Sequence, residues 1–79
     1  MIFEKLSKLV ADQFGVHPDE VTMETSFSQD FRADSVDLVE LMMAVEETFS
    51  LGEVEENDLE GIKTVGDVVE YIKDRVKED

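Results

Sequence analysis

Apolar residues recur at intervals of three and four near both ends of the chain, which is the period of an amphipathic helix. The first set lies at Phe3, Leu6, Leu9, Val10 and Phe14. Gly15 follows directly, where a glycine can end a helix in the left-handed conformation. Thr64 and Asp67 resemble a capping box and predict a last helix that begins at Thr64. Its apolar stripe lies at Val65, Val68, Val69, Ile72 and Val76.

The middle of the chain predicts two more helices, a long one over residues 36–49 and a weaker one of one or two turns over residues 57–62. No stretch alternates at the period of a strand. We therefore expect an all-α fold, a small four-helix bundle of three main helices and one short helix, in a single domain over residues 1–79.

The connection from Gly15 to Asp34 is long for a compact domain. Residues 17–20 contain the only proline and predict a local turn. The rest is expected to be a loop that four apolar side chains pin across the bundle, namely Val16, Val21, Phe27 and Phe31.

The helix over residues 36–49 has more apolar residues than one core-facing stripe requires. At about 100° per residue, a core stripe forms on one side, at Leu38, Leu41, Met42, Val45 and Phe49. A second set lies on nearly the opposite side and is flanked by two carboxylates. We call this set the outer strip; it consists of Val36, Val39 and Met43 with Glu40 and Glu47.

The outer strip has the apolar centre and charged rim of a docking surface, and we interpret it as one that a basic-rimmed groove recognises. Two alternatives remain open from the residues alone. Exposed apolar side chains are common on protein surfaces, so the strip can be ordinary surface. It can also pack beneath the long loop.

The net charge is −14, and residues 9–62 account for it with 15 acidic residues and one basic residue, Arg32. A field of this sign repels nucleic acid and anionic membranes and speeds encounter with basic surfaces. Cysteine is absent, which excludes disulfides, a thiol nucleophile and cysteine-based metal sites. No signal-peptide pattern or membrane-spanning apolar run is recognised, so we expect a soluble, cytoplasmic protein.

Asp34 and Ser35 precede the long middle helix, and either can be its N-cap. Capping is the simplest interpretation of Ser35. Catalysis is not expected, because no histidine or lysine lies near Ser35 in the sequence and the acidic surroundings oppose an alkoxide. His17, the only histidine, is interpreted as a loop residue. A phosphate ester on Ser35, by contrast, would meet free N–H groups and the positive end of the helix dipole.

These residues resemble a known family. Asp34-Ser35-Val36-Asp37, with the run from Val39 to Glu47 and Phe49, strongly resembles the acyl carrier proteins of fatty acid synthesis. The likeness covers essentially the whole chain, including a long first loop that ends in F-x-x-D-F-x-A-D-S and the closing T-V-G-D-V-V-E-Y-I.

The resemblance implies a non-catalytic carrier of acyl chains, held as thioesters on a 4′-phosphopantetheine arm attached to Ser35. A separate phosphopantetheinyl transferase would move that group from coenzyme A with Mg²⁺. Positions that face basic patches on partner enzymes would be Asp34, Val36, Asp37, Val39, Glu40, Met43 and Glu47. The family often shelters the carried acyl chain between its helices. Residues that could line such a cavity, although each is equally explained as an ordinary core residue, are Leu41, Val45, Ile62 and Val68. We expect no metal ligands and a monomer.

Three departures from the family pattern are visible. Arg32 stands where these proteins commonly have glycine, Val36 replaces the commoner leucine, and residues 50–56 lack the usual isoleucine-proline turn. They leave the pathway open between fatty acid biosynthesis and a specialised polyketide or aminoacyl carrier. An unmodified acidic helical adaptor and a small hydrolase using Ser35 and His17 are the alternatives outside the carrier class.

Four acidic residues, Glu53, Glu55, Glu56 and Asp58, follow the long middle helix. They lack the glycine and the oxygen spacing of an EF-hand loop. We interpret them as a solvated acidic face.

Overall fold

The computed structural model describes residues 2–76, and these residues form five α-helices and one 3₁₀-helix. The elements are α1 (Ile2–Phe14), η1 (Pro18–Glu20), α2 (Phe27–Phe31), α3 (Ser35–Phe49), α4 (Glu56–Leu59) and α5 (Val65–Val76). Within this part of the chain the only β-type pairing is an isolated antiparallel bridge between Ser26 and Thr64. The predicted all-α bundle is confirmed: α1, α3 and α5 are its three long helices and α4 is the predicted short one, while α2 is an additional short helix.

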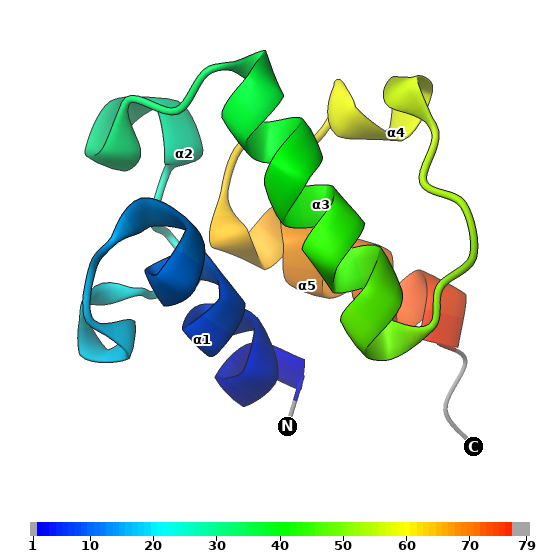
Figure 1. The fold of residues 1–79 in the computed structure, drawn as a ribbon, viewed down its shortest axis with the longest axis horizontal. Helices are drawn as coiled ribbons and strands as arrows, with labels where there is room; N and C mark the ends of the chain where they lie inside the picture. Colours follow the sequence, from blue (N-terminus) through cyan, green and yellow to red (C-terminus); the bar gives the residue numbers. More distant parts are fainter. Residues whose placement is uncertain (1, 77–79) are drawn as a thin grey trace.

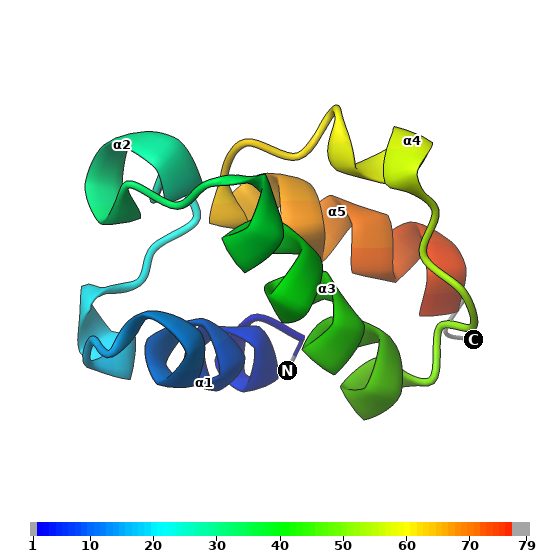
Figure 2. The same cartoon turned by 45° about the horizontal axis from the view of Figure 1, so that its top comes forward.

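The long helices surround one apolar core. α1 packs closely on both α3 and α5, and α3 crosses α5 (Figures 1 and 2). α2 and α4 flank the start of α3 on opposite sides in both views. The core contains the buried residues of all three predicted stripes, namely Leu6, Val10, Leu41, Met42, Val45, Val65, Val68, Val69 and Ile72, together with Val21, Phe27 and Ile62.

The helix ends follow the capping signals in the sequence. Gly15 has φ 70° and its N–H donates to the carbonyl of Ala11, as a left-handed C-cap requires. At the start of α5, Asp67 Oδ2 accepts the N–H groups of Lys63 at 2.9 Å and Thr64 at 3.1 Å. The Thr64 hydroxyl in turn accepts the N–H of Asp67 at 3.2 Å. Thr64 is therefore the cap, and the helix itself begins one residue later.

The connection between α1 and α3 contains a helix that the pattern of apolar residues did not predict. η1 occupies the expected turn, whereas α2 lies where a loop was expected. Ser26 caps α2, because its Oγ accepts the N–H of Gln29 at 3.1 Å and its own N–H donates to Asp30 at 2.7 Å. The expected pinning residues do pack on the core: Val21 and Phe27 are buried, and Val16 and Phe31 are half-buried.

Asp67→Ala is expected to lower the free energy of unfolding by about 1 kcal/mol at neutral pH, because it removes the carboxylate half of the capping box at the start of α5. The N–H groups of Lys63 and Thr64 hold the pKa of Asp67 below its ordinary 3.8. The stabilisation by this carboxylate is therefore present above the ordinary pKa and disappears as the pH falls through the lower folded pKa.

The difference between Asp67→Ala and the unsubstituted chain should consequently stay constant from neutral pH to about pH 5 and shrink below 3.8. Urea unfolding followed by circular dichroism at several pH values measures this difference. An equally large difference in strong acid would contradict the assignment.

Candidate functional site

Ser35 is the first residue of α3, and its N-cap is Asp34. Asp34 Oδ1 accepts the N–H of Asp37 at 3.0 Å, and Asp37 Oδ2 accepts the N–H of Asp34 at 3.2 Å. This reciprocal pair is a capping box, so the interpretation of Ser35 as the cap is wrong. The Ser35 side chain is exposed and makes no hydrogen bond within residues 2–76. The Ser35 hydroxyl therefore takes no part in capping α3.

Two surface grooves meet at Ser35. One lies between α3 and α4, has a volume of about 650 Å³, and is lined by Ser35, Val36, Leu38, Val39, Glu40, Glu56, Asn57, Leu59 and Glu60. We call it the α4 groove. The other has about 630 Å³ and lies between α2, the start of α3 and residues 60–64. We call it the α2 groove. The α4 groove has the more apolar walls. The walls of the α2 groove are mixed and include serine, threonine and glutamine side chains, three carboxylates, Lys63 and four apolar residues.

The outer strip is exposed along α3. Val36, Val39 and Met43 have exposed fractions of 62%, 38% and 59%, and they are three of the four exposed large apolar side chains in the described residues. The alternative that the strip packs beneath the long loop is therefore wrong. Both rim carboxylates are exposed, and Glu40 also accepts a hydrogen bond from the amide of Gln13 at 2.9 Å.

Of the four residues suggested as lining for a carried chain, three are core residues and one lines a groove that contains Ser35. Leu41, Val45 and Val68 are 0% exposed in the core, and Ile62 lines the α2 groove. In the α4 groove, the half-buried apolar side chains near Ser35 are those of Leu38 and Leu59. The angle of Leu38 on the helix predicts a position in the core stripe. Leu38 remains half-buried because it lies in the first turn of α3, where the bundle ends.

Arg32 and His17 each have a clear local role. Arg32 ends α2 with φ 55°, and its N–H donates to the carbonyl of Phe27. This left-handed conformation favours glycine, which gives a physical reason for the glycine that the resembled family commonly has there. His17 is exposed, precedes η1, and lines neither groove that contains Ser35. The structure does not bring Ser35 and His17 together in a common groove.

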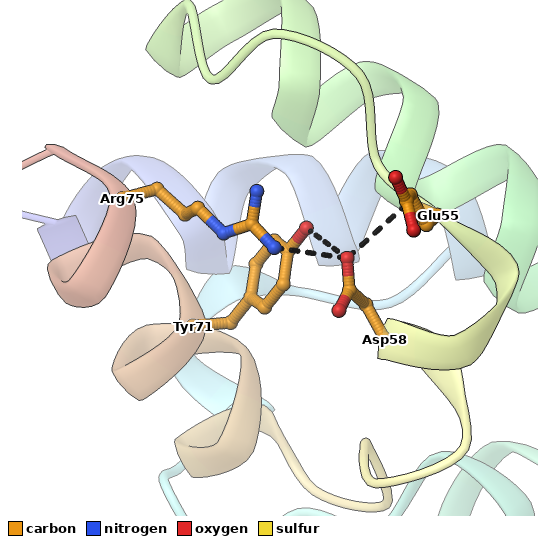
Figure 3. A network of polar contacts seen from close by, with 4 residues as sticks. All are labelled: Glu55, Asp58, Tyr71 and Arg75. Carbon is orange, nitrogen blue, oxygen red and sulfur yellow. Dashed lines mark hydrogen bonds and ion pairs between the residues drawn. The ribbon is translucent and has the colours of Figure 1, made fainter.

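Asp58 is held by α5, which corrects its interpretation as part of a solvated face. Its Oδ2 accepts the Tyr71 hydroxyl at 2.9 Å, the Arg75 guanidinium at 2.9 Å and the N–H of Glu55 at 3.2 Å (Figure 3). The Tyr71 hydroxyl and the Glu55 N–H are the main causes that lower the pKa of Asp58. Burial, followed by the bond to Asp58, raises the pKa of Tyr71 to about 12.

The other three acidic residues of that segment, Glu53, Glu55 and Glu56, are exposed. Across residues 2–76, no group of three or more histidine, aspartate or glutamate side chains is arranged to hold a metal ion. No helix in the same range is both long and apolar enough to cross a membrane.

Comparisons with known proteins identify relatives over the whole length. Residues 4–72 match the family described as phosphopantetheine attachment site. An acyl carrier protein of Clostridium perfringens (strain SM101 / Type A) is 50% identical over 76 residues, which is 96% of this chain and 99% of that protein. An acyl carrier protein of Clostridium acetobutylicum is 47% identical over 78 residues, 99% of this chain and 100% of that protein.

A solved structure agrees with the fold. The acyl carrier protein from Enterococcus faecalis matches with a TM-score of 0.76 at 31% identity, over 94% of this chain and 92% of that one. The helical architecture described above is therefore shared with a protein of the same kind as the sequence relatives.

The capping assignment predicts effects of different size for two neighbouring substitutions. Asp34→Ala should lower the free energy of unfolding by about 1 kcal/mol, because it removes the cap of α3. Ser35→Ala should change it by less than about 0.5 kcal/mol, because the hydroxyl has no structural partner. Urea unfolding of both variants measures the two values. A larger loss for Ser35→Ala than for Asp34→Ala would show that the serine is the cap.

Proposed function

We propose, from the premise that this chain belongs to the acyl carrier proteins with a phosphopantetheine attachment site, that Ser35 is the residue to which the cofactor is attached. Members of this family are carriers and not catalysts, and the chain bears 4′-phosphopantetheine covalently. The observation that carries the choice of residue is the free hydroxyl at the start of α3. Asp34 performs the capping that would otherwise occupy it.

The surroundings of Ser35 suit an anionic ester. The N-terminal N–H groups of α3 and the positive end of its dipole favour a phosphate at this position. The neighbouring carboxylates of Asp34 and Asp37 partly oppose it, although each is already bonded to a backbone N–H. An exposed side chain at the edge of two open grooves also leaves space for a long arm on either side.

Attachment requires a separate enzyme. In the transfer, Ser35 Oγ forms a bond to the phosphorus that carries the pantetheine of coenzyme A, and adenosine 3′,5′-bisphosphate leaves. We assign the base that accepts the hydroxyl proton to the transferase, because neither groove that contains Ser35 presents a histidine and the carboxylates that line the grooves are exposed and intrinsically weak bases. Mg²⁺ bound by the transferase would stabilise the charge on the transferred phosphate. The arm supplies a terminal thiol, which forms the thioester with the acyl group.

The outer strip is the proposed surface for the transferase and for acyl-processing enzymes. Its three apolar side chains are exposed, and Glu40 and Glu47 on its rim complement a basic partner. Ser35 and Val36 are neighbours at the start of α3, so a partner on the strip would meet the arm. Asp34 and Asp37 lie beside the attachment point, and their carboxylates contribute to the same negative field.

We further propose that the carried groups are the acyl chains of fatty acid biosynthesis. The residues around Ser35 resemble those carriers in register with the helices, and the acidic excess argues against aminoacyl cargo. In this proposal residues 1–79 act as one monomeric, cytoplasmic carrier domain.

Incubation with a phosphopantetheinyl transferase, coenzyme A and Mg²⁺ should add the mass of one phosphopantetheine, and Ser35→Ala should abolish the gain. Ser28→Ala is the matched control, because Ser28 is also an exposed serine and lines the α2 groove. Intact-protein mass spectrometry measures the result. An unchanged mass with several active transferases, or modification of Ser35→Ala, would refute the assignment.

Glu47→Lys should weaken the interaction with the transferase about tenfold at low ionic strength, because it reverses a charge on the rim of the outer strip. Glu70→Lys is the control, since it makes the same change in net charge at an exposed position of α5. The KM of the transferase for each variant, measured from low salt to about 1 M, tests the surface. Equal effects of both substitutions would mean that only the overall charge matters.

A further inference from the structure

α4 makes fewer packing contacts with the rest of the molecule than the long helices do. It has four residues, none of them buried, and it packs less closely on the other helices than α1 does. Leu59 and the preceding Val54 are only half-buried against the core. Apolar burial alone therefore provides little to keep α4 in one position.

One oxygen atom provides the polar attachment of α4 to α5. Within the described residues, the side-chain hydrogen bonds that join α4 to another helix all end on Asp58 Oδ2 (Figure 3). Tyr71 and Arg75 lie four residues apart and therefore on one face of α5. The Arg75 guanidinium also lies over the Tyr71 ring, 4.5 Å from its centroid, which holds both donors in place.

The same short helix forms one wall of the α4 groove. Asn57, Leu59 and Glu60 line it from one side, and Val36, Leu38 and Val39 line it from α3. Ser35 lies at the edge of this groove. The distance between α4 and α3 therefore sets the width of this groove. An aliphatic chain attached at Ser35 can be covered by apolar side chains only if that width stays small.

We propose that Asp58, Tyr71 and Arg75 form a latch that holds α4 in place and so determines how well the α4 groove shelters the chain carried at Ser35. The three residues are positioning residues, because none of them lines the groove. The inference rests on the proposed attachment at Ser35 for its cargo, but the latch itself concerns the unmodified chain as well.

The latch is tested first without any cofactor, by amide hydrogen exchange of the unmodified chain. Tyr71→Phe removes one hydrogen bond to a charged acceptor and retains the ring, the Arg75 contact and the Glu55 N–H bond. The N–H groups of Glu60 and Ile62, which donate to Asn57 and Leu59, report on the α4 segment. Their exchange should become about tenfold faster, the effect of losing one such bond. Amides in the interior of α1 and α3 should not change.

Arg75→Met should act in the same direction, and Arg75→Lys should partly restore slow exchange by supplying a donor. Lys73→Met is the matched control, because Lys73 is an exposed cation on α5 with no hydrogen bond or ion pair within residues 2–76. Unchanged exchange at Glu60 and Ile62 in both Tyr71→Phe and Arg75→Met would overturn the latch.

The cargo effect is tested on the carrier loaded with acyl chains of increasing length. Cleavage of the thioester by hydroxylamine should be up to about tenfold faster in Tyr71→Phe than in Lys73→Met for the chains that the unsubstituted carrier protects. A uniform loss of stability would affect all amides and would not single out these chains. Equal cleavage rates in the two variants would overturn the sheltering role.

The two proposals fail in different ways. A chain that gains no phosphopantetheine mass at Ser35 overturns the proposed function and the sheltering role with it. The exchange of Glu60 and Ile62 in the unmodified chain then still decides whether Asp58, Tyr71 and Arg75 hold α4.

Discussion

The reciprocal bonds between Asp34 and Asp37 are the constraint on which the functional end of the molecule depends. They fix where α3 begins, and a helix that begins at a fixed residue presents each later side chain at a fixed angle. The burial of Leu41 and Met42 turns one side of this helix to the core, and Val36 and Met43 then face solvent. The same bonds use aspartate rather than serine for the cap. The hydroxyl beside them is thereby left exposed between two grooves.

Carboxylates perform two different tasks in this chain, although all contribute to the charge of −14. Asp37 and Asp67 close capping boxes, and Asp58 joins α4 to α5. Their negative charge is stabilised by N–H or O–H donors at short range. Glu47 and Glu70 have no such donors within residues 2–76, so their field extends into solvent. Part of the acidic composition therefore holds the fold together, and the remainder is available to basic partners.

The sequence predicted the long elements because α1, α3 and α5 bury continuous stripes whose period is visible without a structure. It did not predict α2, since five residues are too few for a period and the helix depends on the Ser26 cap and the burial of Phe27. In the sequence, Arg32 is visible only as a departure from a family pattern. The structure supplies the reason for the pattern, because the residue that ends α2 must adopt a positive φ. The D-S-V-D motif and its family resemblance indicate the proposed attachment site, whereas the position of Ser35 before the helix indicated only a possible cap.

The sequence by itself determined the order of the three long helices, the division of α3 into two apolar faces and the candidate serine, because all three follow from local spacing and motif. Only the tertiary structure decided which of Asp34 and Ser35 caps the helix, which residues floor the groove beside Ser35, and that Asp58 bonds to α5. Leu38 and Leu59 lie 21 positions apart, and Asp58 and Tyr71 lie 13 apart. Such pairs meet because the packing of separate helices brings them together, and the spacing of residues along the chain carries no record of that packing.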